Sequence, residues 1–270
     1  MQHEFDKVTT LDAVTPSRFS GVLDAGWGVA DVPNGGYVMA LALRAVQATL
    51  PPALHDPLTA TAHYLKPARP GPLAIDVETV KVGKRLATSA ARLFQIAPGS
   101  DREVEVVRML VTSGNLAEPG AVAFARGEPP PMPSPDECAI FDAPEIVTIA
   151  RRVRILYDPE TLAFARGERT GVTELRGHAR FADDREPDVV SLALFADAFP
   201  PAVFNRALAP WVPTVELTVH FRARPTPGWL RCVFSTRFAS GGVMEEDGEL
   251  WDASGALVAM SRQLAVAPKD

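Results

Sequence analysis

The clearest pattern in the chain is the stretch 38–46, where apolar residues cover almost every side of a helix. The turn Asn34-Gly35-Gly36 leads into this helix, and Pro51-Pro52 ends it. A helix that is apolar nearly all round must be enclosed by other elements, so we expect it in the core. Before it, residues 5–32 mix apolar residues with turn formers, which predicts one or two strands.

Several stretches after this helix alternate or run apolar and are separated by glycine, proline or charged turns, as strands of an antiparallel sheet are. In the first half these predicted strands are residues 58–66, 73–82, 86–96 and 103–113. Five prolines within residues 129–135 then make residues 115–145 a predicted linker. In the second half the predicted strands are residues 151–157, 161–166, 171–182, 214–223, 229–238, 244–252 and 256–266.

The two halves contain an internal repeat. Residues 61–73 (TAHYLKPARPGPL) align without gaps with residues 218–230 (TVHFRARPTPGWL), at an offset of 218 − 61 = 157. The alignment matches Thr61 with Thr218 and His63 with His220. Two copies of one structural unit are the simplest explanation.

The repeated unit has a lead-in strand, a buried helix and four antiparallel strands that curl around it, which describes a hotdog fold. We therefore predict an α+β protein with two tandem hotdog units, a double hotdog, each with a long helix wrapped by a curved sheet. The predicted boundaries are residues 1–114 for the first unit, 115–145 for the linker and 146–270 for the second unit. The two sheets are expected to join into one.

Asp197 is the only ionisable residue between Asp188 and Arg206, and it lies in an apolar stretch. The pattern predicts a helix with Asp188 as its N-cap that ends before Pro200. Asp197 would lie in the last turn, where burial and the helix dipole both disfavour a carboxylate. Two readings stay open: a buried carboxylate whose perturbed ionisation serves a function, or a frayed turn that points into water.

Positions at which the copies differ are candidates for chemistry. By the same offset, Asp197 corresponds to Ala40 and Thr214 to Pro57. Gln263 corresponds to the region of Val106. Polar groups that only one copy carries are not needed for the shared fold.

These residues resemble those of the acyl-CoA thioesterase II family, the TesB-like double hotdog enzymes. The family has an Asp on the second helix, a Thr at the start of the next strand and a Gln on the last strand; here LFADAFP supplies Asp197, VPTVELTVHFR supplies Thr214, and LVAMSRQLA supplies Gln263. The NGGY segment resembles the family's Gly-Gly turn. The resemblance covers about residues 5–267 and implies hydrolysis of acyl-CoA.

Thioester hydrolysis requires a base for the attacking water and donors for the oxyanion. Asp197 is the predicted base or, alternatively, a nucleophile that forms an anhydride. Gln263 and Thr214 are expected to hold the water, although strict alternation puts Thr214 on the wrong strand face unless the strand start is bulged. The predicted oxyanion or substrate-binding residues are Asn34, Gly35 and Gly36.

Coenzyme A carries phosphates, so basic residues beside the repeated turn are candidates for binding them. These are Lys66, Arg69, Arg222 and Arg224, with a solvated surface role as the alternative. The charged residues Glu245, Glu246 and Asp247 are interpreted as a solvated hairpin turn.

Composition narrows the class of protein. A net charge of −6 and a pI near 5.5 argue against nucleic-acid or anionic-membrane partners. Isolated Cys138 and Cys232 indicate reduced thiols and no zinc site, and we expect no metal or redox cofactor. The first ten residues lack the apolar core of a signal peptide, so we expect a soluble cytoplasmic protein without membrane insertion. Exposed sheet edges favour a homo-oligomer, a dimer or larger.

Two other functions remain open at this level. A non-catalytic acyl-CoA or lipid-binding protein would keep the fold without turnover. A hotdog hydratase is less compatible, because no histidine follows an aspartate with the Asp-x₄-His spacing associated with those enzymes.

Overall fold

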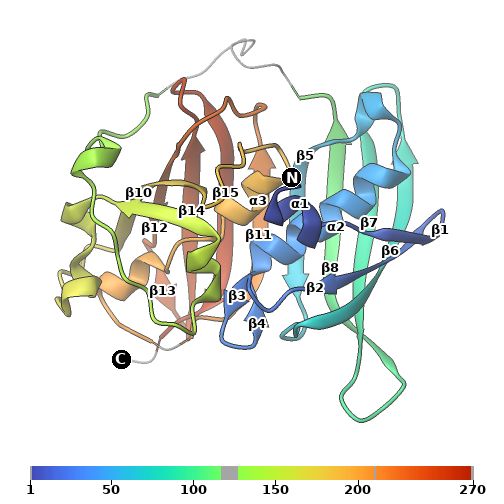
Figure 1. Cartoon of the computed structure of the whole chain (residues 1–270), viewed down its shortest axis with the longest axis horizontal. Helices are drawn as coiled ribbons and strands as arrows, with labels where there is room; N and C mark the ends of the chain where they lie inside the picture. Colours follow the sequence, from blue (N-terminus) through green and yellow to red (C-terminus); the bar gives the residue numbers. More distant parts are fainter. Residues whose placement is uncertain (1, 117–126, 210, 269–270) are drawn as a thin grey trace.

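The computed structural model describes residues 2–116, 127–209 and 211–268. Its main feature is one long antiparallel sheet that curves around helices from both halves of the chain (Figure 1). A separate two-stranded ribbon, β3 (Gly28–Val29) with β4 (Val32–Pro33), precedes the central helix. None of the helices in the described ranges combines the length and apolarity needed to cross a membrane.

The first half follows the sequence pattern closely. The predicted core helix is α2 (Gly35–Thr49), and its residues from Gly36 to Leu43 are all buried. The four predicted strands are β5 (Asp56–Tyr64), β6 (Gly71–Val82), β7 (Ala87–Ile96) and β8 (Glu103–Gly114). The leading segment forms α1 (Glu4–Val8), which the pattern did not predict, then β1 (Asp12–Thr15) and β2 (Arg18–Leu23). Figure 1 shows α2 lying across the strands of this half, and it contacts β5 to β8.

Six of the seven strands predicted in the second half are present. They are β9 (Val153–Tyr157), β10 (Glu174–Phe181), β11 (Thr214–Phe221), β12 (Leu230–Ser235), β14 (Val243–Trp251) and β15 (Leu257–Val266), with the short β13 (Ala239–Ser240) beside β14.

The strand predicted at residues 161–166 is wrong. This segment forms 3₁₀ turns at Pro159–Thr161 and Ala163–Arg166. Pro159 at the first position favours a helical turn, and the Asp158 carboxylate accepts from the N–H of Glu160 at 3.0 Å. Buried Asn205 then accepts from the N–H of Phe164 at 3.0 Å, which satisfies the second turn without a strand partner.

The halves share one sheet and one strand order. The order is β1-β2-β6-β7-β8-β5 and then β11-β15-β14-β12-β10-β9. Outward from the β5–β11 junction, β8, β7, β6, β2 and β1 of the first half correspond to β15, β14, β12, β10 and β9 of the second half. At that junction Thr61 pairs with Thr218, its equivalent in the sequence repeat, and their hydroxyl oxygens are 2.9 Å apart. Strands from both halves therefore form one continuous sheet.

The second helix is much shorter than predicted, since α3 spans only Ser191–Phe195. Its N-cap is Val190, and the predicted cap Asp188 closes the turn just before it: Asp188 Oδ1 accepts from the N–H of Ser191 at 2.7 Å, and the Ser191 hydroxyl accepts from the N–H of Asp188 at 2.8 Å. The helix ends early because the chain turns at Asp197 toward the start of α2, where the Asp197 side chain finds hydrogen-bond donors. The expected long second helix is therefore wrong.

Helices α2 and α3 cross at Gly36. A Cβ atom at this position would lie 2.2 Å from the carbonyl oxygen of Ala193 and 2.9 Å from the Cα of Leu194. Only glycine permits such a close approach of the two backbones.

Part of the predicted linker 115–145, residues 117–126, lies outside the described residues. The remainder packs on the second half: Ala139 exchanges two backbone hydrogen bonds with Tyr157, each 2.8 Å, and the Phe141 ring lies 5.2 Å from that of Phe164. This segment does more than connect the halves, since it supplies part of a cavity wall.

Candidate active site

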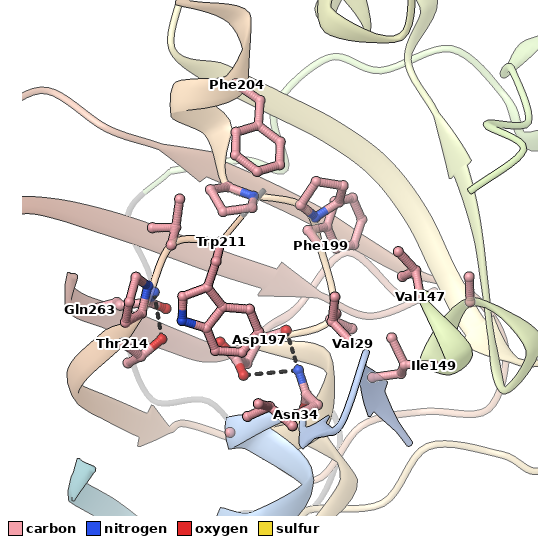
Figure 2. A pocket seen from close by; sticks show the side chains of 18 of the residues that line it. Val29, Asn34, Val147, Ile149, Asp197, Phe199, Phe204, Trp211, Thr214 and Gln263 are labelled. Atoms are coloured by element: carbon pink, nitrogen blue, oxygen red, sulfur yellow. Dashed lines mark hydrogen bonds between the residues drawn. The ribbon is translucent and has the colours of Figure 1, made fainter. Parts of the chain in front are cut away.

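A cavity of about 680 Å³ lies where segments of both halves meet. Its wall includes the start of α2, the end of β5, the segment after the linker prolines, the turn after α3, and parts of β11, β12, β14 and β15. Figure 2 shows the side chains around it, with Asp197, Asn34, Thr214 and Gln263 labelled. Most of the wall is apolar, as in binding sites for small molecules with hydrophobic parts.

Asp197 lies in the turn directly after α3 and faces this cavity. Its Oδ2 accepts from Asn34 Nδ2 at 2.9 Å and from the backbone N–H of Gly36 at 3.0 Å. Within the described part of the chain, Oδ1 accepts no hydrogen bond and is free to act on a ligand. The reading in which Asp197 points into bulk water is thus wrong.

Burial raises the pKa of Asp197 to about 6, while the N–H groups of Gly36 and Gly35 and the Asn34 amide oppose this rise. The sequence pattern predicts that the dipole of its own helix disfavours the carboxylate. Instead the carboxylate faces the N-terminus of α2, where unpaired N–H groups and the positive end of the dipole favour a negative charge. The raised pKa thus reflects desolvation by the apolar wall.

Asn34 and Gly36 are directed at Asp197. Asn34 Nδ2 donates to the main-chain oxygen of Asp197 at 2.6 Å as well as to its carboxylate, while Asn34 Oδ1 caps α2 by accepting from the N–H of Tyr37 at 2.9 Å. These N–H groups are therefore not available to a thioester oxygen in this arrangement. The oxyanion or substrate-binding role of Asn34, Gly35 and Gly36 therefore stays a prediction, and in this structure their donors act on the Asp197 carboxylate.

Thr214 and Gln263 form a hydrogen-bonded pair in the cavity wall (Figure 2). Gln263 Nε2 donates to the Thr214 hydroxyl at 2.9 Å, and Gln263 is only 8% exposed. The pairing of β11 with β15 shifts register between Thr214 and Glu216, which is the strand-start bulge that the alternation pattern required. Thr214 thereby reaches the cavity that also contains Asp197.

Tyr64, at the end of β5, was not among the predicted site residues. Its hydroxyl donates to the carbonyl oxygen of Gly35 at 2.8 Å, and its side chain lines the cavity. Burial, together with the charges of Asp197 and Glu216, raises the pKa of Tyr64 far above its usual range, so it remains a neutral donor. No sequence signal distinguished it from a core tyrosine.

Glu246 was also missed, because residues 245–247 were interpreted as a hairpin turn. They lie within β14, and the turn is formed by Gly241 and Gly242 with φ of 62° and 80°. Glu245 and Asp247 point outward, whereas Glu246 is 8% exposed and lines the cavity. The signal was available, since the residues two before and two after Glu246, Met244 and Gly248, are not polar and share its strand face.

Only one of the four candidates for coenzyme A phosphates, the exposed Lys66, lines the cavity. Arg224 forms an ion pair with the buried carboxylate of Asp56 at 2.7 Å, and Arg222 donates to the carbonyl oxygen of Leu58 at 2.9 Å. Arg69 is exposed outside the cavity wall. Arg222 and Arg224 thus contribute to the junction between the halves.

Comparison with known proteins identifies the family. The acyl-CoA thioesterase N-terminal domain model matches residues 23–114, and the C-terminal domain model matches residues 125–267. An uncharacterized protein of Mycobacterium tuberculosis is 25% identical over 270 residues, covering 93% of this chain and 91% of that protein.

Two solved structures support the same grouping. A thioesterase II candidate from Thermobifida fusca is 29% identical, covers 99% of this chain and 98% of its own, and superposes with a TM-score of 0.89. A protein of unknown function with the hot dog fold, from Alicyclobacillus acidocaldarius, is 25% identical over 100% of both chains, with a TM-score of 0.84. The hotdog fold and the resemblance to thioesterase II are confirmed, and the chain belongs to the acyl-CoA thioesterase family, enzymes that hydrolyse thioesters.

Proposed function

We propose that this thioesterase hydrolyses a fatty acyl-CoA, or a related acyl thioester, to the free acid and coenzyme A. The proposal rests on one observation: Asp197 and the hydrogen-bonded pair Thr214–Gln263 line the same cavity. Asp197 has a raised pKa and a free Oδ1 there. Such a wall offers a base and polar donors to a thioester bound among apolar side chains.

In the proposed mechanism, Asp197 Oδ1 removes a proton from a water molecule as the water oxygen bonds to the thioester carbon. The carbon–sulfur bond then breaks, and the thiolate of coenzyme A takes the proton back from Asp197. A group of this kind contributes about 10²–10⁴-fold to the rate. Asn34 and Gly36 hold Oδ2 and leave Oδ1 to act on the water.

Thr214 and Gln263 supply the polar contacts. Gln263 uses one N–H group on the Thr214 hydroxyl oxygen, so its second N–H and the hydrogen of the Thr214 hydroxyl are left for a water or for the thioester oxygen. Their shared position in the wall supports this role.

We further infer that the hotdog fold of this chain is a double hotdog, with units at residues 1–114 and 146–270 joined by the segment 115–145. The identical strand order of the two halves supports this, as does the pairing of repeat equivalents Thr61 and Thr218. Only the second unit carries Asp197, while the first supplies Asn34 and Gly36, so neither unit alone would contain a working site.

Lys66 is our candidate for binding a phosphate of coenzyme A. It is the cationic side chain among the described cavity residues, and its exposure suits a contact with a hydrated anion.

The test is release of coenzyme A thiol from a panel of acyl-CoAs by the wild type, Asp197→Asn and the control Asp184→Asn. Asp184 is exposed and has a φ of 59°, which asparagine adopts readily, so the control should retain full activity. Asp197→Asn should lose at least about 10²-fold in kcat. Tight binding without thiol release by the wild type would instead identify a binding protein, and hydration of an unsaturated acyl-CoA would identify a hydratase.

A single turnover in ¹⁸O-water tests for the anhydride route in which water attacks the Asp197 carbonyl carbon. The proposed base mechanism puts ¹⁸O only in the product acid. Appearance of ¹⁸O in the Asp197 carboxylate would show that an anhydride forms on Asp197.

A further inference from the structure

Glu246 is a buried carboxylate that the proposed mechanism does not use. Its Oε2 accepts from the backbone N–H of Ala202 at 2.6 Å and, more weakly, from the Thr236 hydroxyl at 3.5 Å. Within the described ranges, Oε1 has no hydrogen-bond partner, and the carboxylate has no ion pair. Because Glu246 is 8% exposed and lines the cavity, a carboxylate oxygen without a partner lies at a substrate site.

The part of the cavity near Glu246 is aromatic. Phe199 lies 4.9 Å from Phe234 and 5.7 Å from Tyr157, ring centre to ring centre. Phe234 lies on β12 opposite Gly248, two residues after Glu246. The wall continues from Tyr157 to Phe141 at 6.4 Å, and all these rings line the cavity.

Tyr157 adds a second polar group to this wall. The residue is 5% exposed and lines the cavity, and its hydroxyl makes no hydrogen bond to any other described residue. Two polar side chains, each more than nine-tenths buried, are thus left without full partners in one aromatic region. Native structures rarely leave such groups unsatisfied, and a ligand is one of the ordinary partners.

A plain fatty chain fits this region poorly. It would cover Oε1 of Glu246 without offering a donor, and leaving a buried polar group unpaired is unfavourable, more so for a charged group. An aromatic ring, by contrast, gains from edge-to-face contacts with the wall. A phenolic hydroxyl is a good donor to a carboxylate oxygen and introduces no charge that would need a counter-ion.

We propose, building on the proposed thioesterase function, that the preferred substrates are acyl thioesters whose acyl group is a hydroxylated aromatic ring, with the ring hydroxyl donating to Glu246 Oε1. Glu246 thereby determines which acyl group is accepted, and Asp197 carries out the hydrolysis. Burial raises the pKa of Glu246 to about 7, so at neutral pH both of its protonation states are present, and either one hydrogen-bonds a hydroxyl group.

The test compares kcat/KM within matched pairs of acyl-CoAs that differ by one hydroxyl group. The aromatic pairs are the three hydroxyphenylacetyl-CoA isomers against phenylacetyl-CoA, and the aliphatic pairs are hydroxydecanoyl-CoA isomers against decanoyl-CoA. In the wild type, at least one hydroxyphenylacetyl-CoA should exceed phenylacetyl-CoA by about tenfold or more, as expected for a site that hydrogen-bonds a substrate hydroxyl. The aliphatic pairs should show a smaller preference.

Two variants and one control tie the preference to Glu246. Glu246→Leu should abolish it, mainly by improving kcat/KM for phenylacetyl-CoA. Glu246→Gln keeps the shape of the side chain and an acceptor oxygen, so it should retain part of the preference. This variant still tests the role of Glu246 if the leucine variant does not fold. Glu249→Gln alters a carboxylate that lies on the same strand outside the cavity wall and should leave the preference unchanged.

The outcomes separate this inference from the proposed function. The inference is overturned if the two members of the aromatic pair are hydrolysed at equal rates. It is also overturned if the enzyme has a stronger preference for hydroxydecanoyl-CoA or for an aminoacyl-CoA. Either outcome leaves the proposed thioesterase function standing. If no acyl-CoA is hydrolysed, the proposed function fails. Binding of non-hydrolysable thioether analogues then tests Glu246 directly, and equal affinities with and without the ring hydroxyl overturn the inference.

Discussion

Asn34, at the start of α2, donates through one amide nitrogen to both the main-chain oxygen and the Oδ2 of Asp197, at 2.6 and 2.9 Å. The two residues are 163 positions apart in the chain. The contact fixes the direction of the proposed base, and it joins the helix of the first half to the turn that ends the helix of the second.

Asn34→Ala should lower kcat by about 10²-fold, because a small displacement of a reacting group costs that much. It should also lower stability by about 1 kcal/mol through loss of the helix cap. Asn34→Asp separates the two effects, since aspartate caps a helix but places a second carboxylate beside Asp197. Thiol-release kinetics and thermal unfolding measure them, and full activity in Asn34→Asp would contradict the orienting role.

The pH dependence should report the ionisation of Asp197. A base must be ionised, so kcat/KM should be constant at alkaline pH and fall tenfold per pH unit below about pH 6. The ionisable side chains lining the described cavity are Asp197, Glu246, Tyr64, Tyr157 and Lys66. The charge of Asp197 raises the pKa of Glu246, and this coupling is mutual.

Glu246→Gln should leave the acidic limb of the pH–rate profile near pH 6, because Glu246, with a pKa of about 7, is already mostly protonated and uncharged where Asp197 titrates. Profiles of the wild type and this variant with one good substrate make the comparison. A limb displaced to lower pH in the variant would show that Glu246 is ionised in the range where Asp197 titrates.

Thr214 and Gln263 should act as one unit. Thr214→Val and Gln263→Leu should each lower kcat by about 10²–10³-fold, as removal of one donor to a developing charge does in hydrolases. The double variant should lose little more than either single variant, because each change already breaks the shared hydrogen bond. Thr214→Ser keeps the hydroxyl and should stay close to wild type. Additive losses in the double variant would argue against a joint role.

Two adjacent glycines should differ in their response to alanine. Gly36→Ala forces a Cβ into the backbone of α3, 2.2 Å from the Ala193 oxygen. It should therefore lower the free energy of unfolding by about 3 kcal/mol, as severe overpacking of a core does. Gly35→Ala meets the Tyr64 hydroxyl at 2.9 Å and Asp197 Oδ2 at 3.0 Å, both at the ends of side chains. It should reduce activity more than stability. Denaturant unfolding and thiol release measure the difference, and equal stability of the two variants would contradict the close helix crossing.

Stability should depend on pH through Glu246. Its pKa is raised from 4.5 to about 7 in the folded protein. Its contribution to the free energy of unfolding is therefore fully present below about pH 4.5 and is lost as the pH rises through about 7. Glu246→Gln should therefore gain thermal stability over the wild type at pH 8 and not at pH 4, by on the order of 1–3 kcal/mol. A difference in melting temperature that is the same at both pH values would exclude an ionisation effect.

The sequence by itself determined the elements whose residues interact mainly with their neighbours in the chain. The apolar run of α2 has proline at its end, and the alternating strands β5 to β8 have turn residues between them, so their boundaries are local. The repeat offset aligned Thr61 with Thr218, and these two residues pair where the strands of the two halves meet. Divergence between the copies singled out Asp197, Thr214 and Gln263, and all three line one cavity.

Only the tertiary structure decided how those residues are held. The length of α3 depends on donors that α2 supplies, and no local pattern contains them. The inward direction of Glu246 depends on the register of β14 against β12 and β15, since a shift of one residue would turn its side chain to solvent. Local propensity acts over a few residues, whereas the ionisation and orientation of a buried carboxylate are set by groups that are distant in the chain and adjacent only after folding.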